Sequence, residues 1–242
     1  MKIHDRIHVI GGGDNSFGLS HALDCTVYLL DGGTEGALID AGSGLESTLI
    51  LKNLVAAGFS PNFVRKILLT HAHADHCGGA DTLSKHCGAT IYAGAAAADF
   101  LVRGDLDAMS IRPAIESGLY PPDYQVSCVQ VHALYDGEVV SVGDLHLCVM
   151  DLPGHSDGHV GFYLEFDKKK LLFSGDLVFG KAKISLQKTW DCRLQPYINS
   201  LKRVQKLKID ALFTGHQAFC LDGAYRILDR VLAPGCMLPS NL

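Results

Sequence analysis

The part of the chain that most restricts its fold is a dense cluster of histidine and aspartate, residues 70–76, with the sequence T-H-A-H-A-D-H. It directly follows the apolar run 64–69, which is typical of a buried strand. The end of a buried strand holds the backbone in a fixed position, so closely spaced side chains there can converge on one point. Three imidazoles and one carboxylate within six residues supply the nitrogen and oxygen donors that zinc, iron or manganese accepts. The cluster therefore predicts a metal site at a strand end.

Three later segments also place metal-binding residue types directly after apolar runs. They are residues 152–159 (L-P-G-H-S-D-G-H), 174–176 (S-G-D) and 214–216 (T-G-H). Any single histidine of the twelve in the chain is more often an ordinary polar residue than a metal ligand. That interpretation does not explain four strand ends that each supply a donor, so we expect the four to meet around metal.

Together these segments resemble the metallo-β-lactamase superfamily, whose H-x-H-x-D-H motif, later glycine-histidine, aspartate and final histidine occur here in the same order. The resemblance extends from about Cys25 to His216. It implies an α/β fold, namely a four-layer αββα sandwich in which two sheets pack face to face with helices outside. The two comparable halves of strands and helices expected from the sequence agree with this fold.

The resemblance also implies two neighbouring metal sites joined by one bridging aspartate. The first set of ligands is His71, His73 and His155, the second is Asp75, His76 and His216, and the bridging residue is Asp176. The expected cofactors are two divalent ions, with zinc favoured and iron or manganese as alternatives. Three or four protein ligands for each ion leave one position open for water or substrate, as in catalytic sites.

The activity that such a site implies is hydrolysis. Two divalent ions about 3.5 to 4 Å apart share a water and lower its pKa to about 7, so that a hydroxide nucleophile forms at neutral pH. One ion polarises the carbonyl or phosphoryl oxygen of the substrate, and both stabilise the charge that develops there. Asp75 is the candidate catalytic residue, because a carboxylate at this place would orient the nucleophile or accept its proton.

Residues next to these ligands have weaker claims to a role. Asp40 resembles the aspartate of the family's I-D-x-G segment, and we expect it to hold a ligand histidine in position. The alternative for Asp40 is a turn aspartate that accepts backbone hydrogen bonds. Cys77 and His159 are not expected to bind metal, because the other donors already complete two sites. Four more residues are expected to be solvated at the pocket border: His21, Lys181, Lys183 and Trp190.

The composition predicts a compact protein with one domain, residues 1–242, because 48% of the residues are hydrophobic. The net charge of −5 and the scattered Lys and Arg indicate no nucleic-acid surface, and no apolar stretch reaches the roughly 18 residues that span a bilayer.

The eight cysteines form no C-x-x-C pair. We expect them to be reduced and mostly buried, which indicates a cytoplasmic location. The expected partner is a small-molecule substrate, and an apolar patch on residues 109–123 would permit a homodimer.

Hydrophobic periodicity predicts the order of the secondary-structure elements. The expected strands are 3–10, 25–30, 37–40, 64–69, 89–92, 127–132, 139–142, 145–150, 159–166, 171–174 and 209–213. The expected helices are 45–57, 79–86, one that begins near residue 94, 193–207 and 221–232. Three prolines interrupt residues 109–123, so we expect an irregular connector there that shapes the substrate pocket.

An aspartate at the bridging position resembles glyoxalase II and the lactonases, which favours a small ester, thioester or lactone as substrate. The zinc β-lactamases carry cysteine there, and the chain lacks the basic arm and long insertion of the RNA-cleaving members. Only 26 residues follow His216, so we expect no helical glutathione-binding domain of the glyoxalase II kind.

Three alternative functions stay open at this point. A phosphodiesterase of the same fold would use the same water to attack phosphorus. A mono-iron sulfur oxygenase resembling the persulfide dioxygenases would hold one iron with two histidines and an aspartate, and would consume O2. A non-catalytic protein would bind a small molecule at the metals without turnover. Flavodiiron oxidoreductases fit less well, because they carry an acidic residue at the position of His73.

Overall fold

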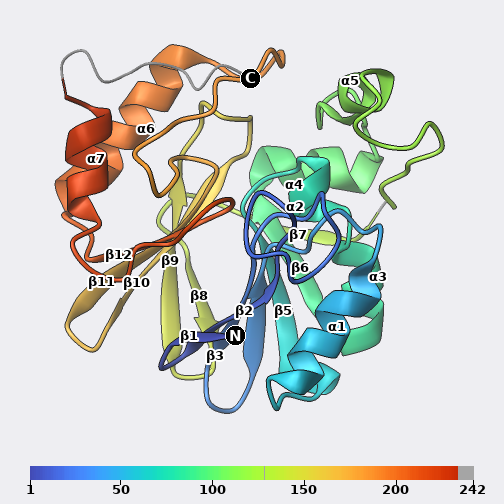
Figure 1. The fold of residues 1–242 in the computed structure, drawn as a ribbon, viewed down its shortest axis with the longest axis horizontal. Helices are drawn as coiled ribbons and strands as arrows, with labels where there is room; N and C mark the ends of the chain where they lie inside the picture. Colours follow the sequence, from blue (N-terminus) through green and yellow to red (C-terminus); the bar gives the residue numbers. More distant parts are fainter. Residues whose placement is uncertain (128, 234–242) are drawn as a thin grey trace.

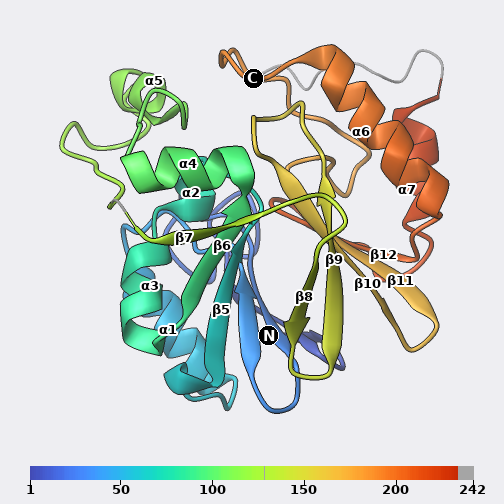
Figure 2. The ribbon, with the colours of Figure 1, turned by 180° about the vertical axis from the view of Figure 1, so that it is seen from behind.

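The computed structural model describes residues 1–127 and 129–233, which form two β-sheets packed face to face with helices on both outer sides (Figures 1 and 2). Within these residues, one sheet has the strand order β1-β2-β3-β4-β5-β6-β7 and the other has the order β12-β11-β10-β9-β8. The first sheet consists of Lys2–His4 (β1), Ile7–Gly11 (β2), Val27–Asp31 (β3), Gly36–Ile39 (β4), Val64–Leu69 (β5), Thr90–Gly94 (β6) and Val131–Leu134 (β7). The second consists of Val139–Val142 (β8), Leu145–Asp151 (β9), Val160–Phe166 (β10), Lys169–Gly175 (β11) and Ala211–Thr214 (β12). This arrangement confirms the predicted αββα sandwich.

Helices cover the outer face of each sheet. The outer face of the first sheet packs against Ser47–Ala56 (α1), Ala80–Cys87 (α3) and Ala95–Arg103 (α4), and the second sheet packs against Leu194–Leu207 (α6) and Tyr225–Val231 (α7) (Figures 1 and 2). Three shorter helical segments are Pro61–Phe63 (η1), Ala74–Cys77 (α2) and Ile111–Glu116 (α5). Of these, α2 and α5 are the ones that shape the site described below.

Buried apolar side chains fill the three spaces between the four layers. In β5, Ile67 and Leu69 face the helices α1 and α3, whereas Leu68 faces the second sheet. Successive side chains of a strand point to opposite faces, so a strand buried on both faces needs apolar residues throughout. This explains the unbroken apolar end of β5, which carries the histidine cluster.

The strand pairings bring the four predicted strand ends together. β5 pairs in parallel with β4 and β6, and β11 pairs in parallel with β12. Two backbone hydrogen bonds then join the ends: Val160 N–H donates to the Thr70 carbonyl over 2.8 Å, and Gly215 N–H donates to the Gly175 carbonyl over 2.9 Å. The first of these bonds joins the two sheets.

Three expected elements differ in the structure. The single strand expected at 3–10 is a hairpin of β1 and β2 with a turn at Asp5 and Arg6, and the alternating pattern continues through this turn. In place of the strand expected at 127–132, the structure has β7, which begins only at Val131. Residue 128 lies outside the described part. The connector 109–123 contains the helix α5, in which Pro113 is tolerated because the first turn of a helix needs no N–H donors.

Two further expectations concern membranes and cysteines. Among the described residues, no helix is both long and apolar enough to cross a bilayer. The described cysteines carry free thiols: Cys25, Cys77 and Cys87 are buried, and Cys148, Cys192 and Cys220 are partly buried. The prediction of reduced thiols is confirmed for these six, while Cys128 and Cys236 lie outside the described residues.

Candidate metal centre

The loop after β5 carries four of the seven predicted ligands. Its start is fixed by Thr70, whose N–H donates to Asp40 Oδ1 over 2.7 Å. The chain continues in an extended conformation to His73 and then enters α2, a single helical turn. Extended backbone before the turn and helical backbone within it place His71, His73 and the α2 residues Asp75 and His76 around one point.

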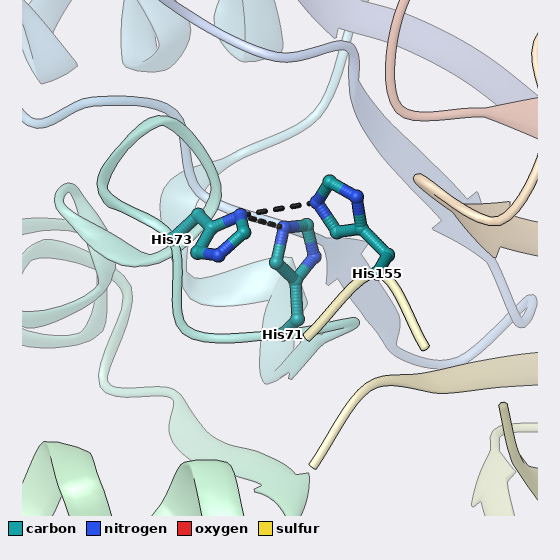
Figure 3. Close-up of side chains that lie close together, drawn as sticks. All are labelled: His71, His73 and His155. Atoms are coloured by element: carbon teal, nitrogen blue, oxygen red, sulfur yellow. Dashed lines mark hydrogen bonds between the residues drawn. The ribbon is translucent and has the colours of Figure 1, made fainter. Parts of the chain in front are cut away.

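The first predicted ligand set meets as expected. His73 Nδ1 lies 3.1 Å from His71 Nε2 and 3.0 Å from His155 Nε2, and all three side chains are buried. Figure 3 shows the three rings pointing toward one another. His155 reaches this point because Gly154 bends the loop after β9 with a φ of +132°, and a Cβ on Gly154 would lie 2.3 Å from the backbone of Tyr197.

These three imidazoles are held in the neutral form. Burial is the main cause that lowers the pKa of each ring, and it lowers the pKa of His155 to about 3. A neutral imidazole has one nitrogen with a free lone pair, which is the form that binds metal. Three rings that present nitrogens to one another in this form fit a shared cation.

The second predicted set also meets. His216 Nε2 lies 2.9 Å from Asp75 Oδ2, and His76 Nε2 lies 3.4 Å from His216 Nε2 and 3.5 Å from Asp75 Oδ2. The ligand atoms of these three residues lie within 4.8 Å of one another, as do those of the first set. Each set draws on both sheets, since His155 follows β9 and His216 follows β12 of the second sheet, whereas the other ligands of the two sets follow β5 of the first.

Asp176 lies between the two sets. Its Oδ2 is 3.6 Å from His155 Nε2 in the first set and 3.5 Å from His216 Nε2 in the second, and its Oδ1 is 3.4 Å from His76 Nε2. Oδ1 is buried and has no hydrogen-bond partner among the described residues. A buried carboxylate oxygen without a partner is costly, and a metal ion next to it would satisfy it. The donor set therefore fits two ions that share Asp176.

Two hydrogen bonds to neighbouring side chains hold the backbone at Asp176 in place. The hydroxyl of Tyr197 donates to the Asp176 carbonyl over 2.6 Å, and the Asp176 N–H donates to His159 Nε2 over 3.2 Å. His159 is buried and its pKa is lowered to about 3, mainly by burial, so it accepts this bond in the neutral form. As expected, His159 belongs to none of the described groups of ligand atoms.

The second half of the centre is rich in negative charge. Burial alone would raise the pKa of Asp75, but His76 and His216 lower it to about 2. Burial opposes protonation of His76, but the neighbouring carboxylates of Asp75 and Asp40 help to raise its pKa well above its usual value. Excess negative charge of this kind attracts a cation, which agrees with the carboxylates predicted for this half.

Asp40 is close to both sets, at the end of β4. Its Oδ2 is 2.8 Å from His76 Nδ1, and the hydroxyl of Thr70 donates to the same carboxylate over 2.9 Å. The Thr70 hydroxyl also lies 3.0 Å from His71 Nδ1, so it can accept that ring's N–H. Asp40 thus contacts a histidine of the second set directly and one of the first set through Thr70. In both rings Nε2 is left facing the centre.

We expect the variant Asp40→Ala to bind metal roughly 10- to 100-fold more weakly, because residues that orient metal ligands have effects of this size. The same variant leaves the buried His76 ring without its partner, so the free energy of unfolding should fall by about 3 kcal/mol. Metal competition titrations and chemical denaturation measure the two effects. Asp40→Asn is the matched control, because asparagine tolerates the φ of +61° and keeps one acceptor oxygen. Unchanged metal affinity in Asp40→Ala would show that Asp40 is only a turn residue.

The other residues that the sequence singled out near the centre, for which no metal ligation was predicted, do not belong to either ligand set. The thiol of Cys77 points to the Ala72 carbonyl at 3.3 Å, away from the two sets. Lys181, Lys183 and Trp190 are exposed, and His21 is partly exposed. Sequence reasoning missed Cys25, whose buried sulfur lies within 4.8 Å of ligand atoms of Asp40 and His76. No spacing in the sequence signals this contact, and burial raises the pKa of Cys25 to about 12, which keeps its thiol protonated.

A hollow of about 450 Å³ opens onto the centre. His73, Asp75 and His216 form part of its wall, and the opposite wall comes from Met109–Tyr120 around α5 and from Gln187–Thr189. The connector therefore lines the space next to the predicted ligands, as expected from the sequence. A volume of this size is typical of small-molecule sites.

Comparisons with known proteins agree with this geometry. The sequence profile of the Metallo-beta-lactamase superfamily matches residues 22–216. Acyl-coenzyme A thioesterase MBLAC2 of Homo sapiens is 30% identical over 228 residues, which cover 83% of this chain and 75% of that protein. Hydroxyacylglutathione hydrolase of Chelativorans sp. (strain BNC1) is 29% identical over 183 residues, which cover 75% of this chain and only 57% of that protein.

A solved structure shows the same fold. The metallo-beta-lactamase of Cronobacter sakazakii, solved as a HARLDQ motif mutant, has a TM-score of 0.70 and 23% sequence identity, with coverage of 89% of this chain and 79% of that one. At this level of identity the likeness concerns the fold alone. Because the superfamily profile matches most of its length and the two sheets have the matching architecture, the chain belongs to the metallo-beta-lactamase superfamily.

Proposed function

We propose that this protein is a hydrolase that uses two divalent metal ions to cleave a small thioester or a related ester or lactone. The observation that carries the proposal is the position of Asp176, whose carboxylate faces both ligand sets at 3.4 to 3.6 Å. The thioester class is supported by the relatives, since one is named as an acyl-coenzyme A thioesterase and another as a hydroxyacylglutathione hydrolase.

In this proposal each ion has its own protein donors. His71, His73 and His155 would hold one ion, Asp75, His76 and His216 the other, and Asp176 both. Two such ions, most simply zinc, would polarise the substrate carbonyl and lower the pKa of a water to about 7, which supplies a hydroxide nucleophile. Because the donors of each set come from strand ends of both sheets, the packing of the sheets would fix the separation of the two ions.

The residues of the chain itself have three tasks. Asp40 and Thr70 orient the rings of His76 and His71 through their Nδ1 atoms. Asp75 is ionised at neutral pH and lies in the wall of the hollow, so its carboxylate can accept a hydrogen bond from the attacking water and orient it. The apolar wall around α5 excludes bulk water from the bound substrate, which strengthens the electrostatic interactions at the reacting carbonyl.

The alternatives fit these observations less well. A mono-iron oxygenase would need two histidines and one aspartate, and would leave the second set of Asp75, His76 and His216 without a task. A phosphodiester substrate would bring a permanent negative charge into the hollow, where Lys188 is the one lysine in the described lining. Both alternatives are separated from the thioesterase proposal by the assays below.

The test is a panel of thioesters, oxygen esters, lactones and phosphodiesters, assayed with the zinc-loaded protein, and an O2 electrode measurement with persulfides on the iron-loaded protein. We expect measurable hydrolysis of one bond class, with thioesters first, and no O2 consumption with persulfides. The control is the same preparation after chelation, which should lose the activity. Hydrolysis of phosphodiesters alone, O2 uptake, or inertness toward every substrate would each refute the proposal in favour of one of the alternatives.

A further inference from the structure

A second hollow adjoins the one at the candidate metal centre. The second hollow has a volume of about 440 Å³, and three residues line both spaces: Leu23, Leu119 and Tyr120. The second lies on the far side of these residues from His73, Asp75 and His216, none of which lines it. A substrate whose reacting bond lies at the metal centre would therefore meet the second hollow only with its distal end.

Among the shared residues, Leu119 is the one whose side chain can be replaced with the least disturbance of the packing. Tyr120 is 5% exposed and its ring packs against that of Tyr124 in a tilted arrangement with a centroid distance of 4.5 Å, whereas Leu119 is 54% exposed. The Leu119 backbone is nevertheless fixed, because its N–H donates to the Ala114 carbonyl over 3.0 Å just after the left-handed Gly118 at φ +79°. The side chain thus stands at a fixed point between the two spaces.

The lining on this side suits an uncharged, apolar group. The wall of the first hollow consists here of Met109, Ile111, Pro113 and Ala114, and that of the second includes Leu45, Ile115, Pro121 and Pro122. Asp24, the acidic residue on this side, already accepts bonds from the N–H and the hydroxyl of Ser43 and from the N–H of His21. The Nδ1 atom of His21 accepts the N–H of Leu23. The described lining of the second hollow contains no Asp, Glu, Lys or Arg, so an ionic group placed there would find no oppositely charged partner of these types.

We infer that the two hollows together accept the acyl chain of the substrate, and that Leu119 sets the chain length that is hydrolysed best. This inference rests on the proposed thioesterase function and adds a residue that determines specificity. A short chain fits the first hollow, whereas a long chain must pass Leu119 to reach apolar contacts in the second. Removing the side chain opens this path, and enlarging it closes the path.

The test uses butanoyl, octanoyl and dodecanoyl thioesters of N-acetylcysteamine, a small neutral thiol, with the zinc-loaded full-length protein. Leu119→Ala should raise the ratio of kcat/KM for dodecanoyl over butanoyl about tenfold, the size of effect that pocket length exerts on hydrophobic substrates. Leu119→Trp should lower the same ratio, because the larger side chain narrows the path to the second hollow. Val102→Ala is the matched control, since Val102 is 44% exposed on α4 and lines neither hollow.

A binding measurement separates this inference from the proposed function. Calorimetry uses the butyl and dodecyl thioethers of the same thiol, which cannot be hydrolysed. Leu119→Ala should raise the affinity for the dodecyl thioether relative to the butyl thioether, and Leu119→Trp should lower it. Shifts in binding without any thioester hydrolysis would overturn the thioesterase function but support the chain site. Hydrolysis with the same chain-length profile in the wild type, Leu119→Ala and Leu119→Trp would overturn the inference and leave the function intact.

Discussion

Asp176→Ala should lower kcat/KM for the preferred substrate by more than about 100-fold, because residues that only orient metal ligands already account for 10- to 100-fold. Asp176 has a larger expected effect than any other single ligand. Its two carboxylate oxygens face both ligand sets, so its loss removes a donor from each ion at once. Steady-state kinetics and metal content measured on the same preparation give the result.

The control for this variant is Asp222→Ala, which removes an exposed carboxylate whose ion pair with Lys169 is 3.5 Å long. Exposed pairs contribute little to stability, so this variant should keep full activity. Far-UV circular dichroism of both variants separates a loss of fold from a loss of catalysis. Full activity of a folded Asp176→Ala protein would refute the assignment of Asp176 as the shared ligand.

Removal of metal by a chelator such as dipicolinate should lower Tm by about 8 to 16 °C. A ligand present at 1,000 times its Kd stabilises the folded state by about 4 kcal/mol, and each kcal/mol shifts Tm by about 2 to 4 °C in a protein of this size. The structure explains the direction of the shift. Without a cation, the partly exposed carboxylate of Asp75 and the buried carboxylates of Asp176 and Asp40 lose the divalent charge that would hold them close together. Differential scanning calorimetry before and after chelation measures the shift, and added zinc should reverse it.

The specificity of this shift can be checked with two variants. Asp176→Ala, which holds metal weakly, should show a much smaller shift on chelation than the wild type. His146→Ala removes an exposed histidine of β9 that lies outside every described ligand group, and it should show the wild-type shift. Equal Tm values with and without chelator in the wild type would argue against structural coupling between metal and fold.

Much of the candidate site could be predicted from sequence because each ligand directly follows a strand. The last three residues of β5, Ile67 to Leu69, are apolar and buried on both faces, so the change to histidine and aspartate after Leu69 marks the end of the strand. The same change occurs before His155, Asp176 and His216. Sequence spacing alone does not show that these ends meet in space, and the resemblance to a known family supplied that step.

Other features depend on contacts that a linear pattern does not contain. The hairpin of β1 and β2 was expected as one strand, because the turn at Asp5 and Arg6 has two residues and does not interrupt the alternation of side chains. Helix α5 was expected as irregular because Pro113 disfavours a helix interior, yet Pro113 lies in the first turn, where its missing N–H has no cost.

The surroundings of the ligands were also only partly predictable. Asp40 was identified from its motif, but its path through Thr70 to His71 depends on a hydroxyl whose orientation is set by the packing of β4 against β5. Cys25 and Leu119 gave no signal, because each acquires its position from residues distant in the sequence: Cys25 beside His76, and Leu119 between the two hollows.

The most direct test of the central claim is the number of metal ions per chain, measured by elemental analysis of protein purified without added metal and again after equilibration with zinc. Two clusters of donors that share Asp176 predict close to two ions per chain in the equilibrated protein, and loss of both on chelation together with the activity. A reproducible value of one iron per chain, unchanged by excess zinc, would contradict the account.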